Sequence, residues 1–346
     1  MKTKIIDLFC GCGGMSKGFE QAGFEVALAV DFWKDAITTY KYNSPSVNAF
    51  CMDVHDLDNQ MMAKCFRKED IVGIIGGPPC QGFSTVGKRE INDPRNQLYL
   101  EYCRIVKEIS PEFFVIENVK GLTTLNKGAV LKDIIRRFSE MGYHVAYKVI
   151  NAADFGVPQN RYRVFFVGMK EKLFCFPKHE GPILTAKDGI SDLPSVEGWD
   201  GESKVVQYTR LPQNDYQRRL RGECVELHNH DFTRHSEQTI GVIRRIPDGG
   251  SIRDLPPEYW QIRKYNKAFE RMSSMRPANT VDTGHRNYFH YEEARIPTVR
   301  ENARLQSFTD DFVFLGTRGS QYKQVGNAVP PLLAFAIANA IKAQMR

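Results

Sequence analysis

Short apolar runs alternate with helix-length stretches through the first half of the chain, and this alternation limits the possible folds more than any other feature. The runs are typical of strands and lie at 4–10, 26–31, 48–53, 72–77, 113–119 and 164–168. Helix-length stretches such as 33–42 and 96–109 lie between them. Strands that alternate with helices in this way form a parallel sheet covered on both faces. The sequence therefore predicts an α/β fold.

The character of the sequence changes near residue 175. Residues 176–204 are rich in Gly, Pro, Ser and Asp and show no period, which predicts a domain boundary. From 205 to 290 the chain is polar, basic and aromatic, in many short irregular pieces. The last stretch, 330–346, begins with prolines and carries an apolar stripe, so a helix is predicted there.

The bulk composition restricts the class of protein and its compartment. The 346 residues include 47 Lys and Arg against 41 Asp and Glu, a net charge of +6 that is compatible with a polyanionic partner. No run of 18 apolar residues is present, so we expect no membrane span. Asp7 lies inside the first apolar stretch, where a secretion signal would not carry a charge. The eight cysteines form no CxxC pair, so we expect reduced thiols in the cytoplasm and no metal site.

Glycines follow the first strand, in the stretch DLFCGCGGMSKGF at 7–19. Such a loop brings backbone N–H groups and a helix N-terminus against the anionic end of a ligand. A dinucleotide-binding fingerprint would need glycine at position 16, where this chain has Ser16. The loop therefore predicts a nucleotide-like site without a clear pyrophosphate cradle, although a tight structural turn would explain the glycines equally well.

Two acids and an aromatic residue lie at the ends of the next two predicted strands. Asp31 follows Gly11 by 20 residues, where a carboxylate can accept hydrogen bonds from ribose hydroxyls. Phe32 could stack on an adenine ring, and Asp53 ends the third strand within reach of an adenine amino group. Together these positions predict an adenosine-like ligand that carries a carboxylate, and S-adenosylmethionine fits.

A thiol, an acid and two arginines are expected at the same edge of the sheet. Cys80 lies in GGPPCQGFS at 76–84, a rigid bend after the fourth strand, although a buried structural thiol is the alternative. Glu117 ends the fifth strand, where a carboxylate needs a partner or a function. Arg161 and Arg163 are two residues apart as a strand begins, so both should point to one face, or form a solvated pair. This combination is typical of a covalent catalyst.

Five stretches carry a resemblance to a known family. DLFCGCGG, GGPPCQGFS, ENV, QNRYRV and QVGNAVPPLLA resemble, in order, the motifs of the DNA (cytosine-5) methyltransferases of bacterial or phage restriction-modification systems. The match covers roughly 4–169 and 292–334. It implies a Rossmann-like S-adenosylmethionine-dependent methyltransferase fold with a second, smaller target-recognition domain.

The resemblance also implies roles for individual residues. Cys80 corresponds to the nucleophile, Glu117 to the glutamate of the Glu-Asn-Val motif, and Arg163, near Arg161, to the second arginine of its motif. In the family the ribose position is commonly glutamate and the stacking position often tryptophan, so Asp31 and Phe32 depart from the pattern and could weaken cofactor affinity. The positions implied for S-adenosylmethionine are Phe9, Gly11, Cys12, Gly14, Asp31, Phe32, Asp53, Val54, Gly77, Pro79, Leu98 and Asn327.

Organisation and partners follow from the same resemblance. Because Asn327 is assigned to the cofactor site, we expect a catalytic domain at 1–175 completed by 317–346, and a target-recognition domain at 176–316. The implied substrate is double-stranded DNA, bound by a monomer in the cytoplasm at the nucleoid, with a cognate restriction endonuclease as a possible companion.

Four other functions remain to be weighed. An amino-group methyltransferase would have Asp, Asn or Ser before Pro-Pro and an aromatic residue after it, where this chain has Gly77 and Cys80. A nuclease is suggested by HNHD at 228–231, but a metal nuclease needs further ligands. A silent DNA-binding module would be expected to lack Cys80 or Glu117. An RNA substrate stays open, although the length of 176–290 favours readout of duplex DNA.

Overall fold

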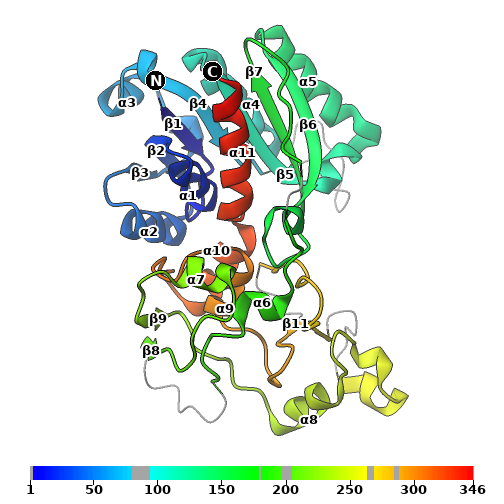
Figure 1. The fold of residues 1–346 in the computed structure, drawn as a ribbon. Helices are drawn as coiled ribbons and strands as arrows, with labels where there is room; N and C mark the ends of the chain where they lie inside the picture. The colour runs from blue at the N-terminus through cyan, green and yellow to red at the C-terminus, as the bar shows by residue number, and fades with distance from the viewer. Residues whose placement is uncertain are drawn as a thin grey trace. The chain divides into compact units, whose positions relative to one another are not determined.

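Two compact units make up the chain in the computed structural model, which describes residues 3–79, 94–178, 181–196, 205–262, 269–283 and 288–345 (Figure 1). The first unit contains 1–151, 162–179 and 331–346. The second contains 152–161 and 180–330. The chain thus returns to the first unit at Pro331, whereas the expected catalytic domain resumes at 317. The function of each domain stays a prediction.

The first unit is built on a seven-stranded sheet, and the predicted α/β class is confirmed. The strand order is β3-β2-β1-β4-β5-β7-β6. All pairs from β3 to β5 are parallel, whereas β7 is antiparallel to both of its neighbours. The bounds are β1 Lys4–Leu8, β2 Glu25–Asp31, β3 Asn48–Cys51, β4 Ile71–Gly76, β5 Phe113–Val119, β6 His144–Asn151 and β7 Tyr162–Met169.

The far edge of this sheet differs from the sequence prediction. Strand β6 was not predicted, because its exposed positions Tyr147, Lys148 and Val149 break the apolar pattern of the other strands. The expectation of a wholly parallel sheet was wrong at β7. Only residues 152–161 connect β6 to β7, and a parallel crossover needs a longer connection. As a consequence β7 begins at the edge where β5 ends, with Arg163 paired to Val119.

Helices cover both faces of the sheet. On one face α1 packs against the C-terminal helix α11, so closely that a Cβ at Gly18 would lie 2.4 Å from the carbonyl oxygen of Pro331 (Figure 1). On the other face an aromatic cluster joins α4 and α5 to the strands, and the rings of Phe114 and Phe138 lie 3.9 Å apart. The helices are α1 Gly14–Gln21, α2 Lys34–Asn43, α3 Asn59–Cys65, α4 Pro94–Ile109, α5 Ala129–Glu140 and α11 Pro331–Gln344.

The second unit is held together by buried ion pairs. The Arg304 guanidinium contacts both Asp192 and Asp310 at distances from 2.6 to 3.2 Å, and all three side chains are fully buried. Arg295 bonds both oxygens of the Glu301 carboxylate at 2.7 Å. The elements are α6 Ala186–Ile190, β8 Val205–Gln207, α7 Asp215–Arg221, β9 Glu226–His228, α8 Glu237–Arg245, β10 Glu270–Arg271, β11 Tyr288–Phe289, α9 Val299–Leu305 and α10 Arg318–Asn327.

One segment, Arg318–Gln344, is long and apolar enough to cross a membrane by length and composition alone. Its most apolar window is 72% buried within the protein, as is usual for a core helix of a soluble protein. We therefore interpret it as part of the core.

Candidate functional site

The loop after β1 has an unusual backbone. Phe9, Gly11 and Gly13 have φ angles of 58°, 54° and 97°, in the left-handed region. Glycine adopts this conformation without cost, whereas Phe9 does so at some strain. No described atom lies within 4 Å of where a Cβ of Gly11 would be, so the loop leaves open space at its centre.

Asp31 fastens this loop to the end of β2. Its carboxylate accepts hydrogen bonds from the backbone N–H of Gly11 and of Trp33, both at 2.8 Å. Burial raises the pKa of Asp31, and the backbone N–H groups of Trp33 and Gly11 oppose that shift. Each carboxylate oxygen has a second lone pair, so the group can also accept hydrogen bonds from a ligand. The ring of Phe32 beside it is 71% exposed and can stack on a planar group.

Asp53 follows β3 and caps the short 3-10 helix η1, Val54–Asp56. Its carboxylate accepts a hydrogen bond from the backbone N–H of His55 at 3.0 Å and lies 2.6 Å from His55 Nδ1. The backbone hydrogen bond from His55 holds the pKa of Asp53 below its usual value. Val54 is buried beneath it. The contact of Asp53 with an adenine amino group stays a prediction.

The bend after β4 is fixed by the end of β5. Asn118 Nδ2 donates a hydrogen bond to the carbonyl oxygen of Pro78 at 2.8 Å. A Cβ at Gly77 would lie 3.3 Å from Glu117 Oε2, so glycine there leaves room beside the carboxylate. Pro79 ends the described part of this bend, and Cys80 lies outside the described residues. Sequence reasoning assigned no role to Asn118, although it lies inside the quoted Glu-Asn-Val motif.

Glu117 has the cationic partner that a buried carboxylate needs. Glu117 is 8% exposed as a residue, and Arg163 Nε lies 3.0 Å from its Oε1. Because β7 runs antiparallel to β5, the start of β7 brings Arg163 to the end of β5. The predicted acid and the second predicted arginine therefore meet at the carboxyl edge of the parallel strands, which is where α/β folds bind ligands.

Arg161 bonds backbone carbonyl groups, whereas Arg163 pairs with a carboxylate. It precedes β7, is fully buried, and donates hydrogen bonds from Nη2 to the carbonyl oxygens of Gly326 and Ala328 at 2.8 and 2.9 Å. The two arginines therefore contact different groups, and the expectation that both side chains serve one face is not met, since only Arg163 is a strand residue. By these contacts Arg161 holds the backbone on either side of Asn327. A catalytic role for Arg161 stays a prediction.

The other predicted cofactor residues occupy varied environments. Cys12 is buried, and burial raises the pKa of its thiol to about 12. Gly14 is the first residue of α1, and Leu98 of α4 packs against the core. Asn327 is an exposed residue at the end of α10, in the second unit. Its assignment to the cofactor site stays a prediction.

The His-Asn-His triplet is structural where its contacts are described. His230 is buried, with Nδ1 3.0 Å from Thr298 Oγ1 and Nε2 2.8 Å from the carbonyl oxygen of Pro194. Burial lowers its pKa. Among the described residues no group of His, Cys, Asp and Glu could hold a metal ion, and the nuclease alternative gains no support.

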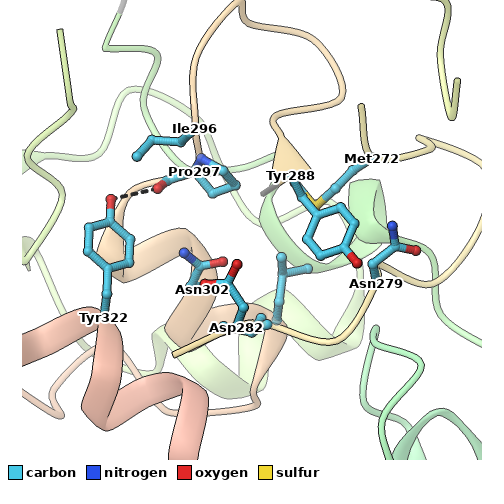
Figure 2. Close-up of a pocket in the computed structure, with 10 residues that line it drawn as sticks. Met272, Asn279, Asp282, Tyr288, Ile296, Pro297, Asn302 and Tyr322 are labelled. Atoms are coloured by element: carbon cyan, nitrogen blue, oxygen red, sulfur yellow. Dashed lines mark hydrogen bonds between the residues drawn. The ribbon is translucent and has the colours of Figure 1, made fainter. Parts of the chain in front are cut away.

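The second unit contains a small pocket that opens to solvent (Figure 2). Polar side chains of Asn279, Asp282 and Asn302 line it beside Tyr288, and Tyr322 closes one side by donating a hydrogen bond to the carbonyl oxygen of Pro297 at 2.7 Å (Figure 2). None of the residues predicted for catalysis or cofactor binding lines this pocket, so it adds nothing to the site described above.

The chain is similar to several known proteins over nearly its whole length. The chain is 39% identical to the type II methyltransferase M.DdeI of Desulfomicrobium norvegicum, over 97% of this chain and 88% of that protein. It is 41% identical to the type II methyltransferase M1.HphI of Haemophilus parahaemolyticus, over 99% and 87%. A crystal structure described as a proposed DNA modification methyltransferase encoded within an E. coli prophage matches 99% of both chains, with a TM-score of 0.83 and 29% identity.

The family match covers nearly the whole sequence. The sequence profile described as C-5 cytosine-specific DNA methylase matches residues 3–343. The predicted family and activity are confirmed, and the amino-group methyltransferase alternative is set aside. The relatives are type II methyltransferases of restriction-modification systems. This chain belongs to the C-5 cytosine-specific DNA methylase family.

Proposed function

We propose that this DNA (cytosine-5-)-methyltransferase takes its methyl group from S-adenosylmethionine and uses Cys80 as its nucleophile. S-adenosylmethionine carries the methyl group on a positively charged sulfur, which makes the group electrophilic. The loop after β1 fits its adenosine half. Gly11 leaves open space, Asp31 has lone pairs for ribose hydroxyls, and Phe32 exposes a ring for the adenine. The remaining residues proposed to contact it are Phe9, Cys12, Gly14, Asp53, Val54, Gly77, Pro79, Leu98 and Asn327.

The single observation that carries the catalytic proposal is the ion pair of Glu117 and Arg163 beside Gly77. It supplies an acid and a cation at the same point of the sheet edge. Asn118 holds the backbone at Pro78, two residues before Cys80. A thiol, a proton donor and a cation for developing negative charge are what attack on a cytosine ring requires.

The reaction follows from the electronics of cytosine, whose C5 is a weak nucleophile. The Cys80 thiolate attacks C6, and the electrons of the C5–C6 double bond move through C4 to N3. Glu117, which must be protonated when the cytosine binds, delivers that proton to N3, and Arg163 holds O2. C5 then accepts the methyl group as the bond from methyl carbon to sulfur breaks and leaves the thioether of S-adenosylhomocysteine, and the N3 proton returns to Glu117. A base or water removes the remaining C5 proton, the C6–sulfur bond breaks, and Cys80 leaves as thiolate. A cytosine stacked inside a duplex is out of reach of these side chains, so the nucleotide must be flipped out of the helix at a cost of about a few kcal/mol.

We propose duplex DNA as the substrate and 176–316 as the domain that reads its sequence. Support comes from the relatives, which are type II methyltransferases, and from the basic runs of the second half, such as RRLR at 218–221. The protein would act as a cytoplasmic monomer, with a restriction endonuclease that cuts the same sequence. Exchange of 176–290 with the segment of a relative of known specificity should change the methylated sequence. If the exchanged protein still methylates the original DNA sequence, residues outside 176–290 recognise that sequence.

Bisulfite sequencing of plasmid DNA from cells that express the protein tests the function. We expect one short sequence in which a single cytosine resists conversion, and full conversion in cells that express Cys80→Ser. Resistant cytosines in both cultures would exclude Cys80 as the nucleophile. Conversion of every cytosine in plasmid DNA, with 5-methylcytosine found in RNA, would exclude DNA as the substrate.

A further inference from the structure

A buried carboxyl group, that of Asp7, lies near the end of β1, just before the loop that we propose binds the cofactor. Asp7 of β1 is 1% exposed and sits between Ala29 of β2 and Ile75 of β4 in the middle of the sheet. Burial of an ionised carboxylate is expensive unless it is paired. The described surroundings offer no cation: the ionisable groups that act on Asp7 or are acted on by it are Asp31 of β2, Glu20 of α1, Cys10 and Cys12 of the loop, Tyr40 of α2 and Tyr102 of α4.

Asp7 begins a chain of hydrogen bonds that crosses three elements. Ser16 Oγ of α1 donates to Asp7 Oδ2 at 2.6 Å, and the hydroxyl of Tyr40 in α2 donates to Ser16 Oγ at 2.8 Å. Ser16 and Tyr40 are as buried as Asp7. Ser16 occupies the position where a dinucleotide-binding loop has glycine. A glycine there could not make the hydrogen bonds to Asp7 and Tyr40 that the Ser16 hydroxyl makes.

Two of the three hydrogen-bonded residues flank the loop after β1 in the sequence, and the third contacts it at Gly13. Asp7 precedes the loop, Ser16 follows it, and the ring of Tyr40 lies beneath it. A Cβ at Gly13 would be 2.9 Å from two carbon atoms of that ring, so backbone and ring are in close contact. We propose that Asp7, Ser16 and Tyr40 are positioning residues that hold the loop in its cofactor-binding shape, with Asp7 acting as a neutral acid.

The neutral form of Asp7 follows from its hydrogen bonds as well as from its burial. Oδ1 is buried and has no hydrogen-bond partner among the described residues. A charged carboxylate would leave that oxygen unsolvated at a large cost, whereas a neutral acid loses much less. In agreement, burial together with the charges of Asp31 and Glu20 raises the pKa of Asp7 to about 8, against the hydrogen bond from Ser16.

The test is calorimetric binding of S-adenosylhomocysteine, the demethylated cofactor, without DNA, and it rests on the cofactor assignment proposed above. Ser16→Ala should weaken binding at pH 7 by about 3- to 10-fold, the range for a lost hydrogen bond. Tyr40→Phe keeps the ring under Gly13, removes only the hydroxyl, and should weaken binding by a smaller factor. Tyr42→Phe, on the exposed side of α2, is the matched control and should bind as the wild type does. Asp7→Asn mimics the neutral acid and should bind within about 2-fold of the wild type.

The outcomes separate the two proposals. Thermal unfolding of each variant shows that binding is measured on folded protein. If both Ser16→Ala and Tyr40→Phe bind S-adenosylhomocysteine with wild-type affinity, the hydrogen bonds between Asp7, Ser16 and Tyr40 contribute only to stability. That result would overturn the positioning role. Binding by Asp7→Asn as weak as by Ser16→Ala would show that Asp7 acts as an anion. A wild type that binds no S-adenosylhomocysteine would overturn the cofactor assignment, and this inference with it.

Discussion

One buried acid of the first unit and two of the second are stabilised in opposite ways. In the first, Asp7 is buried beside other acids and its pKa rises to about 8. In the second, Glu301 and Asp310 are equally buried, but Arg295 and Arg304 overcome the effect of burial and lower the pKa of both acids. The first unit has a large apolar sheet to stabilise it and can tolerate an unpaired acid beside the glycine loop. The second has only two-stranded sheets among its described residues, and both of these buried acids have arginine partners.

The largest effect should come from the ion pair of Glu117 and Arg163 in the first unit. Glu117→Gln cannot deliver a proton to N3, so we expect kcat to fall by about 10²- to 10⁴-fold, the usual contribution of a general acid. Affinity for S-adenosylhomocysteine should be unchanged, because Glu117 is assigned to cytosine. Steady-state kinetics and calorimetry measure the two quantities, and a loss of cofactor affinity equal to the loss in kcat would refute the division of roles.

Removing the arginine of a buried ion pair in the second unit should lower the free energy of unfolding. Arg304→Met takes the hydrogen-bonded cation away from the buried carboxylates of Asp192 and Asp310 and leaves Asp310 with Arg300 at 3.8 Å. This loss should lower the free energy of unfolding by about 3–5 kcal/mol. Denaturant unfolding measures this, with Arg136→Met as the control, since that arginine pairs with Asp133 at the surface. An equal loss for both variants would remove the contrast between the units.

Asp7 should give stability a pH dependence of the opposite sign to that of the paired acids. Its pKa is 3.8 when unfolded and about 8 when folded, so the folded state binds the extra proton between these values. The stability that Asp7 contributes is complete below pH 4 and is lost as the pH rises to 8. Asp7→Asn should therefore gain on the wild type by at most about 1.4 kcal/mol per pH unit from pH 5 to 8. Parallel profiles in denaturant unfolding would show that Asp7 is ionised throughout.

Replacing Asp31 should have a smaller effect than the loss of either ion pair. Asp31→Ala loses the acceptor for ribose and the bonds that fasten Gly11 and Trp33, so cofactor binding should weaken by about 1–3 kcal/mol. Affinity for DNA measured without cofactor should hardly change. Calorimetry that finds equal cofactor affinity for both proteins would refute the ribose assignment.

Much of this site could be read from the sequence because local signals define it. Apolar runs mark the strands, and residues such as Asp31 and Glu117 stand out where those runs end. What could not be read depends on tertiary pairing. The antiparallel direction of β7, which brings Arg163 to Glu117, is decided by the unpredicted strand β6. The contact of Arg161 with Gly326 joins residues 165 positions apart.

The buried hydrogen bonds that link Asp7, Ser16 and Tyr40 beside the glycine loop were missed for the same reason. Ser16 was noted only as an absent glycine, and Tyr40 lies 24 residues further along the chain, in another helix. Asp7 was noted only as a charge within the first apolar stretch. Nothing in their spacing indicates that three polar side chains from β1, α1 and α2 meet.

The most direct test of the central claim is covalent trapping of the enzyme on DNA. A duplex that carries 5-fluorocytosine at the cytosine found by bisulfite sequencing is incubated with enzyme and S-adenosylmethionine. Fluorine cannot leave C5 as a proton does, so the bond between sulfur and C6 cannot break. We predict a denaturant-stable complex in which peptide mass spectrometry places the nucleotide on Cys80, with none formed by Cys80→Ser. A complex linked through any other residue, or one that forms equally with Cys80→Ser, would contradict the account.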